Sequence, residues 1–386
     1  MRRAERPAIG LEVSGLLSPN PTGIGVYGRR LGEALLACGG FDYVLLHPFS
    51  RRRRRTHLPR WKAPVRSYLD GRRLRRSVAL VHALDSRLPG AYRGPLIGTI
   101  YDVLAALPIT REKDLSPRRF QAKKLASYAE ILRRADCVIA ISAATRAALL
   151  EIGTPRGRVE VIPPGIDPPG WLVRDEPAPV SLASFGIRPP YLLAVGALCP
   201  RKNIAAVVGA FRAALAQDPD LRLVVAGEPS FGWEGSRDQD ALRGLGERAV
   251  LTGYLPRDAL WEAYRRARAL VYLSHHEGFG LPVVEALATG SPVLASRRGG
   301  IPEAAGGMAV LVDPDDEGAV ARGISLVLSA EAATKETVAR RREHAAGFRW
   351  SAVAAKVLQI YRDVLAARRD RSNPSSGFVV GDRKQS

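Results

Sequence analysis

Glu277 and Glu285 are the residues whose type and setting are best suited to chemistry. The apolar run Arg268–Ser274 predicts a buried strand, the turn HHEGFG follows it, and a helix is expected to begin at Pro282 and end at Gly290. We therefore expect Glu285 in the first helical turn and Glu277 in the preceding loop. Both carboxylates would then lie near the carboxyl end of a strand, where open α/β sheets bind ligands.

A basic pair, Arg201 and Lys202, follows another expected strand in the segment GALCPRKNI. Gly196 permits a close turn there, and the pair is expected at the start of the next helix. Cations are unfavourable at that end, because the helix dipole places positive potential there. A bound diphosphate would remove the conflict, since Arg201 can hold two oxygens and Lys202 adds a mobile point charge. Surface charge without a ligand is the alternative.

The same sheet edge offers further groups to a ligand. The helix at Pro282 supplies free amide groups from Gly280 and Leu281, which favour an anion. A carboxylate cannot share the position of a phosphate, so Glu285 is expected to hold ribose hydroxyls and Glu277 sugar hydroxyls. Outside this setting, two glutamates at this spacing would usually face solvent.

A glycine-rich segment near the N-terminus matches G-x-G-x-x-G at Gly23, Gly25 and Gly28. The match is weak as a dinucleotide signature, because the glycines lie in a long turn after the expected first strand, Ala8–Val13, and the next strand lacks the acidic residue that holds a ribose. A helix is expected to start near Val26. Glycines there let the backbone approach an anionic or bulky group, and a flexible surface turn is the alternative.

Polar residues end two further expected strands of the first half. Val78–Val81 leads to His82 and Asp85, and Pro95–Tyr101 leads to Asp102. Because parallel strands end at one edge of a sheet, these groups are expected at the same rim. A single histidine is more often structural than catalytic, and both interpretations of His82 stay open.

The chain of 386 residues has a formal net charge of +20, from 58 basic and 38 acidic residues. Such a charge indicates an anionic partner, which can be nucleic acid, a lipid surface or a phosphorylated small molecule. The basic residues concentrate in the first half, at Arg51–Arg55, in the run RRLRR from Arg72, and in the amphipathic segment Pro117–Arg134. That segment fits core packing or an anionic lipid surface, and a merely solvated arginine-rich surface is the alternative.

Other features of composition indicate a soluble protein of the cytoplasm. The hydrophobic share is 46%, and no apolar run approaches the roughly 18 to 20 residues that cross a bilayer. The N-terminal sequence does not fit a secretory signal, and three scattered cysteines indicate a reducing compartment. No metal is expected, because three Asp-x-Asp matches have no ligand cluster around them. They begin at Asp218, Asp238 and Asp313.

Alternating strands and helices predict an α/β fold with two doubly wound, parallel-sheet domains that face a central cleft. The first is expected over 1–167 and the second over 191–349, with a proline-rich linker at 168–190. An amphipathic helix is expected near 350–368, and a tail at 370–386 is expected to be disordered. Strands of the second half are expected at Tyr191–Val195, Leu221–Ala226, Ala249–Leu251, Ala269–Leu273 and Pro292–Ala295.

Four segments together resemble the retaining family 4 glycosyltransferases, which have the two-domain GT-B fold. They are TGIGVYG, VGALCPRKNI, VLTGYLP and HHEGFGLPVVEALATGSPVLAS, and the likeness extends from about residue 8 to residue 365. The resemblance implies a hexosyltransferase that uses a nucleoside diphosphate sugar, with GDP-mannose favoured modestly over other donors. It further implies a saccharide or lipid-linked acceptor in surface polysaccharide synthesis, and a helix near 350–368 that crosses back to the first domain.

The resemblance also implies roles for the residues singled out above. The catalytic group is expected to comprise Glu277, Arg201, Lys202 and Asp102. The donor is expected to contact Glu285, Phe279, Gly280, Leu281, Gly196, Gly23, Gly25 and Tyr101, and the acceptor is expected to contact His82 and Gly23.

One position departs from the family pattern. Many members have His-Asp where this chain has Tyr101 and Asp102, and that histidine is usually placed beside the donor sugar. Tyrosine can form hydrogen bonds but is not a cation at pH 7. Three consequences stay open: a reshaped sugar pocket, a contact taken over in part by His82, or impaired activity.

The expected reaction is sugar transfer to an acceptor hydroxyl with retention of configuration, through an oxocarbenium-like transition state. Arg201, Lys202 and helix amides would stabilise the leaving diphosphate, and Glu277 would orient the sugar. Peripheral contact with the anionic inner face of the cytoplasmic membrane is expected from the basic first half. A catalytically silent sugar-nucleotide or glycan-binding relative is one alternative. A nucleic-acid-binding protein is another, disfavoured because the arginines lack interleaved aromatics and a recognition motif.

Overall fold

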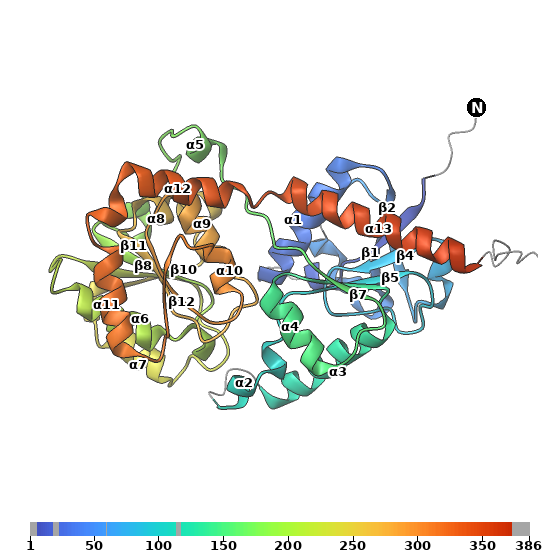
Figure 1. Cartoon of the computed structure of the whole chain (residues 1–386), viewed down its shortest axis with the longest axis horizontal. Helices are drawn as coiled ribbons and strands as arrows, with labels where there is room; N and C mark the ends of the chain where they lie inside the picture. The colour runs from blue at the N-terminus through green and yellow to red at the C-terminus, as the bar shows by residue number, and fades with distance from the viewer. Residues whose placement is uncertain (1–5, 18–22, 59, 113–116, 373–386) are drawn as a thin grey trace, which may run out of the picture.

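Two parallel β-sheets, each covered by helices on both faces, form the structure (Figure 1). The computed structural model describes residues 6–17, 23–58, 60–112 and 117–372. In spatial order, the first sheet consists of β3 (Val65–Tyr68), β2 (Asp42–Pro48), β1 (Ala8–Glu12), β4 (Leu80–Ala83), β5 (Leu96–Ile100), β6 (Cys137–Ala140) and β7 (Arg158–Val161). Its helices are α1 (Gly23–Cys38), α2 (Pro108–Glu112), α3 (Arg118–Arg134) and α4 (Ala143–Ile152).

The second sheet has six strands and a larger set of helices. In spatial order, the strands are β10 (Ala249–Gly253), β9 (Arg222–Ala226), β8 (Tyr191–Val195), β11 (Ala269–Tyr272), β12 (Val293–Ser296) and β13 (Val310–Val312). The helices are α6 (Ile204–Ala214), α7 (Arg237–Arg243), α8 (Arg257–Arg266), α9 (Leu281–Thr289), α10 (Ile301–Ala305), α11 (Glu317–Val327) and α12 (Lys335–Ala346). The predicted fold class, two doubly wound parallel sheets, is confirmed.

Each sheet has one place where the strand order reverses. In the first sheet it lies between β1 and β4, which pair in parallel, and in the second between β8 and β11. Connections leave in opposite directions on the two sides of such a point, which opens a crevice at the carboxyl ends of the strands. The loops after β1, β4, β8 and β11 are therefore the places where this fold can bind a ligand.

The central strands are buried on both faces. All four residues of β11 and all five of β5 are buried, as is most of β8. This agrees with their composition, because strands covered on both faces have continuous apolar runs instead of alternating patterns. The strands β3 and β13 were not predicted, and each is an edge strand of its sheet. Both are short and partly exposed, so neither has such a run.

The last helix, α13 (Trp350–Ser372), lies beside α1 at the first sheet, far from the preceding helices in the chain (Figure 1). The expected helix near 350–368 is thus longer, and residues 370–372 are helical instead of part of a disordered tail; 373–386 lie outside the described residues. The segment between β7 and β8, which the sequence analysis treated as an aperiodic linker, contains the short helix α5 (Gly170–Val173). No helix in the described part of the chain is long and apolar enough to span a bilayer.

Helix α1 begins earlier than expected. Its first residue is Gly23, three positions before Val26, so Gly23 and Gly25 lie in the first turn of the helix and not in a preceding turn. Gly28, one turn later, packs closely against Leu16: a Cβ atom there would lie 2.6 Å from the leucine Cδ2. The third glycine of this pattern therefore allows α1 to pack closely against Leu16. Residues 18–22 of the expected turn lie outside the described residues.

Candidate active site

Arg201, Lys202 and Glu277 meet where the strand order of the second sheet reverses. The basic pair follows β8, and Glu277 follows β11, the neighbouring strand. The pair lies in a 3-10 helix, Pro200–Lys202, and not in the first turn of α6 as expected; Asn203, with φ 52°, separates the two helices. This short helix directs both cations toward the loop after β11 and not along the axis of α6.

The three side chains form an ion cluster in which Lys202 and Glu277 are buried and Arg201 is partly exposed. Lys202 Nζ donates to Glu277 Oε1 at 2.7 Å and to the Tyr272 hydroxyl at 2.9 Å, and Arg201 donates to the other Glu277 oxygen. Glu277 is only 9% exposed. Burial favours a raised pKa for this carboxyl, but Arg201 and Lys202 outweigh burial and hold the pKa well below its ordinary value. Glu277 is therefore an anion that accepts hydrogen bonds and is a weak base.

Gly196 is required by the position of Lys202. Its φ is +129°, a conformation that side chains rarely adopt, and an added Cβ would lie 2.5 Å from Lys202 Cε. The lysine stem therefore lies directly on the backbone that leaves β8. A side chain at this position would push the ammonium group away from Glu277.

Glu285 lies in the second turn of α9, because the helix begins at Leu281 and has no acidic residue in its first turn. The predicted first-turn position is therefore wrong, because the helix begins at Leu281, one residue before the expected Pro282. Its Oε2 accepts a hydrogen bond of 2.9 Å from the Tyr264 hydroxyl. Burial raises the pKa of Glu285, and the nearby Arg257 and the Tyr264 hydrogen bond act against that rise. A role in holding a ribose stays a prediction.

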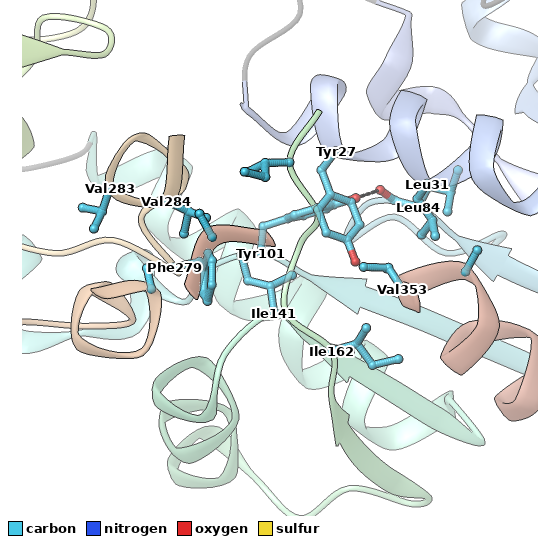
Figure 2. Packing of buried hydrophobic residues seen from close by; sticks show 14 of the residues in the cluster. Tyr27, Leu31, Leu84, Tyr101, Ile141, Ile162, Phe279, Val283, Val284 and Val353 are labelled. Carbon is cyan, nitrogen blue, oxygen red and sulfur yellow. Dashed lines mark hydrogen bonds between the residues drawn. The ribbon is translucent and has the colours of Figure 1, made fainter. Parts of the chain in front are cut away.

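The loop before α9 has the backbone geometry of an anion-binding helix start. Gly280 is the N-cap residue with φ +113°, and Leu281 is the first helical residue, so their amides belong to the unsatisfied first turn. Phe279 is buried, with its ring 5.6 Å from that of Phe348. Figure 2 shows Phe279 in the same buried cluster as Tyr101 of the other domain, so this loop belongs to the contact between the domains.

Tyr101 points into the first domain. Its hydroxyl donates to the backbone oxygen of Leu84, and its ring packs edge-on against Tyr27 with centroids 4.8 Å apart (Figure 2). The side chain is 8% exposed, and burial raises its pKa well above the ordinary value. The structure thus gives the tyrosine an internal partner at the position where the family pattern has histidine. Asp102, the next residue, is half-buried and accepts from the Leu104 amide at 3.3 Å.

His82 lies in the core between the first sheet and α13. Its Nδ1 is 2.7 Å from the Tyr361 hydroxyl and its Nε2 is 2.8 Å from Thr99 Oγ1. The ring has no exposed surface, and burial lowers the pKa to about 3, so the ring is neutral near pH 7. Since both nitrogens are occupied inside the core, this placement does not fit an acceptor-side contact or a substitute for the family histidine. His82 therefore has no part in the function proposed for this protein.

The two domains touch beside the ion cluster. Thr145 Oγ1 donates to the Gly278 carbonyl at 3.2 Å. A Cβ atom on Gly278 would lie 1.8 Å from the Tyr101 carbonyl oxygen, so only glycine fits. The Glu303 carboxylate accepts from the first two amides of α4, at 2.7 and 2.9 Å, and thereby caps a helix of the opposite domain. The loop of the second domain that contains Glu277 therefore contacts the first domain.

Three residues of this region were missed as site residues. Tyr272 is the second partner of Lys202, but it ends the apolar run of β11, and nothing in that run marks it as a site residue. Glu303 lies in the segment GGIPEAA, which has no signal for a contact across domains. Asp85 was noted at a strand end and then left out of the site.

The remaining expected contacts are less defined. Gly23 is exposed, with nothing within 4 Å of the position of a Cβ atom, whereas Gly25 is buried in the first turn of α1. A close approach to donor or acceptor stays a prediction for both. Among the described residues, no three side chains of His, Cys, Asp or Glu gather as metal ligands would. Of the aspartates noted above, Asp313 pairs with Arg298, and Asp238 accepts from the Ala205 amide.

Comparison with known proteins agrees with this architecture. Residues 21–169 match the family described as Glycosyltransferase Family 4, and residues 183–346 match the family described as Glycosyl transferases group 1. The first match covers most of the first sheet and the second covers the Arg201–Glu277 cluster. The chain belongs to the family 4 glycosyltransferases and has the GT-B fold.

Individual relatives differ in what they are named for. A D-inositol 3-phosphate glycosyltransferase of Nocardia farcinica is 30% identical over 287 residues, 71% of this chain and 62% of that protein. O-antigen chain mannosyltransferase B of Escherichia coli is 32% identical over 178 residues, 45% of each chain. This chain thus matches less than two thirds of the length of either relative. A sucrose-phosphate synthase structure from Thermosynechococcus elongatus superposes with a TM-score of 0.71 at 25% identity, covering 94% of this chain and all of that one.

Proposed function

We propose that this protein transfers a hexose from a nucleoside diphosphate sugar to an acceptor hydroxyl, with retention of the anomeric configuration. The observation that carries the proposal is the buried cluster of Arg201, Lys202 and Glu277 where the strand order of the second sheet reverses. Two cations held by one carboxylate, together with the Gly280 and Leu281 amides at the start of α9, can receive the charge of a diphosphate.

The charges of the cluster give its cations and its carboxylate different roles in the proposed reaction. As the bond between the anomeric carbon and the phosphate oxygen breaks, negative charge grows on the diphosphate, and Arg201 and Lys202 stabilise it. Glu277 stays anionic, because the same two cations keep its pKa low. It is suited to accept hydrogen bonds from sugar hydroxyls and poorly suited to take a proton. In the proposed reaction, the acceptor oxygen bonds to the anomeric carbon on the face that the phosphate leaves, and the departing phosphate takes the acceptor proton.

We further propose mannose from GDP-mannose as the preferred donor. The support is the combination TGIGVYG, PRKN and EGFGLP, together with the similarity to an O-antigen chain mannosyltransferase. The acceptor would be a saccharide or lipid-linked saccharide. Similarity to proteins named for inositol phosphate makes a small phosphorylated polyol the competing acceptor.

Contact with an anionic membrane surface is proposed for the first domain. The first turns of α3 expose two arginines, a lysine and the ring of Phe120, which is 51% exposed. Cations beside an exposed aromatic ring are suited to a negatively charged lipid interface. The test is cosedimentation with vesicles of phosphatidylcholine alone or with added phosphatidylglycerol. Neutralising Arg118, Arg119 and Lys123 should release the protein from the anionic vesicles, whereas neutralising the exposed Arg222, Arg243 and Lys335 should not.

A thermal-shift panel of GDP, UDP, ADP and their sugars tests the proposed function. A ligand at about 100 times its dissociation constant stabilises the folded state by roughly 2.7 kcal/mol. The wild type should respond to at least one nucleotide, with the largest shift for GDP. Arg201→Ala should lose that shift, and Arg212→Ala, an exposed arginine of α6, should keep it. A full shift in Arg201→Ala, or no shift with any nucleotide, would refute the diphosphate assignment.

Turnover separates an active enzyme from a silent relative. The wild type should release GDP from GDP-mannose, and release should quicken when an acceptor is added. Binding of nucleotide with no turnover of any donor, in the presence of membrane lipid extract as acceptor source, would favour the silent relative.

A further inference from the structure

A small polar pocket opens in the first domain, across the domain contact from the ion cluster. It lies between the ends of β4 and β5 and the helix α3, and Asp85, Ser86, Asp102 and Lys124 provide its polar lining. Its volume is about 10 Å³, close to what one water molecule needs. The pocket therefore suits a single hydroxyl group inserted from its open side, and it is too small for a sugar ring.

Asp85 supplies an acceptor that the protein does not use. The side chain is only 5% exposed, and its Oδ2 lies 3.5 Å from Arg87 Nε. Its Oδ1 is buried and has no hydrogen-bond partner among the described residues. A buried carboxylate oxygen without a donor is costly, and such groups are rare in folded proteins unless a ligand or water satisfies them.

Lys124 supplies the complementary donor. Its Nζ donates to Ser86 Oγ at 2.8 Å and lies about 6 Å from the centres of the Phe120 and Tyr128 rings. An ammonium group has three protons, so one hydrogen bond leaves it able to donate to a ligand oxygen. A hydroxyl in the pocket can thus donate to Asp85 and accept from Lys124, using both of its hydrogen-bonding functions.

The pocket is placed correctly for an acceptor. Asp85 follows β4, the strand at which the order of the first sheet reverses, as Arg201 and Glu277 do in the second sheet. Asp102, on the pocket wall, has its Cβ 3.1 Å from where a Cβ on Gly278 would lie. Gly278 directly follows Glu277. The pocket therefore adjoins the loop expected to hold the transferred sugar.

We propose that Asp85 and Lys124 form an acceptor subsite that recognises one hydroxyl of a sugar or polyol acceptor, with the Asp85 carboxylate accepting and Lys124 donating. This inference rests on the proposed glycosyl transfer. The subsite binds and orients the acceptor beside Asp102, and it requires an acceptor with a free hydroxyl next to the one that reacts. It makes no contact with the donor diphosphate.

Asp85→Asn and Lys124→Met test the subsite against two matched controls, Asp42→Asn and Lys62→Met, which are exposed residues of the same domain. The acceptor probes are the methyl glycosides of mannose, glucose, galactose and rhamnose and free myo-inositol, each with GDP-mannose and UDP-glucose. Initial rates over a range of acceptor concentration give the acceptor KM and kcat. GDP and UDP thermal shifts report the donor site independently.

Both subsite variants should raise the acceptor KM by roughly 10- to 100-fold, which corresponds to losing one hydrogen bond to a charged group. The controls and the nucleotide shifts should not change. The best probe should also lose most of its activity when the hydroxyl beside the reacting one is replaced by hydrogen, and that loss should be absent in Asp85→Asn. Acceptor KM within twofold of wild type in both variants would overturn the subsite.

Two other outcomes have distinct meanings. A wild type that binds nucleotide but transfers to none of these probes contradicts a subsite for a single sugar or polyol unit. If no nucleotide shifts the wild type, the proposed function itself fails. A folding defect in Asp85→Asn would appear as a lowered melting temperature without nucleotide, and Lys124→Met, at a half-buried position of α3, then decides the question alone.

Discussion

Glu12 should make the first domain less stable as pH rises from about 5 to about 8. This glutamate ends β1 and has no exposed surface. The amide of Ser14 donates to its carboxylate at 3.3 Å and the Tyr68 hydroxyl at 3.1 Å, while Asp85 adds a nearby negative charge. Burial raises its pKa from 4.5 to about 7, despite the hydrogen bonds from Ser14 and Tyr68.

The sign follows from the raised pKa. Between the unfolded and folded values the native state keeps the proton that the unfolded chain releases, so the stabilisation is complete below about 4.5 and is lost as pH rises through about 7. For these two values, the free energy of unfolding should fall by about 2.5 kcal/mol between pH 5 and pH 8 through this group alone. In a unit of this domain's size, that corresponds to a melting temperature lower by roughly 5 to 10 °C.

Glu12→Gln removes the titration and keeps the shape of the side chain. The melting temperature of the wild type, measured at closely spaced pH values from 5 to 8, should therefore fall relative to that of the variant as pH rises. Only the pH dependence of their difference matters, so a constant cost of the substitution does not affect the test. Glu151→Gln, an exposed glutamate of α4, should follow the wild-type curve. A difference between Glu12→Gln and wild type that stays constant across this range would refute the reasoning.

Three further predictions concern the contact between the domains and the ion cluster beside it. Gly278→Ala should keep nucleotide binding but lower kcat/KM by about 100-fold or more, because the new Cβ would strike the Tyr101 carbonyl and hold the domains apart; a small-angle scattering profile equal to that of wild type would contradict this. Glu303→Gln should loosen the same contact, since a neutral amide caps α4 less well, and a larger radius of gyration without ligand is the expected readout. Gly196→Ala should displace Lys202 and abolish the nucleotide thermal shift while the protein stays folded by circular dichroism; an undiminished shift would show that Lys202 does not contact the nucleotide.

The α/β architecture of both halves could be predicted from the sequence, because its signals are local. Buried strands such as β8 and β11 have continuous apolar runs, and helix ends have their own markers. Gly290 ends α9 in a left-handed conformation as predicted, and the Ser142 side chain caps α4. Each of these depends on a few neighbouring residues, so the chain specifies them without knowledge of the tertiary fold.

The residues of the ion cluster were also visible in the sequence, although their arrangement was not. Arg201 and Glu277 are 76 positions apart, and nothing local states that β8 and β11 are neighbours. That adjacency places one carboxylate between two cations, which lowers the pKa of Glu277 and keeps the carboxylate ionised. Sequence spacing cannot supply this result, because a pKa depends on distance and burial.

Tertiary packing decided the roles of the residues on the opposite wall. His82 lies within β4 and Asp85 comes two residues after its end, and both looked equivalent in the sequence as polar residues at a strand end. Packing of α13 places the histidine between Tyr361 and Thr99, where burial keeps the ring neutral, whereas Asp85 lines the pocket beside α3 and has a buried oxygen without a partner among the described residues. The sequence determined which side chains stand at the sheet edges, and the three-dimensional contacts determined which of them are satisfied inside the protein and which remain able to bind a ligand.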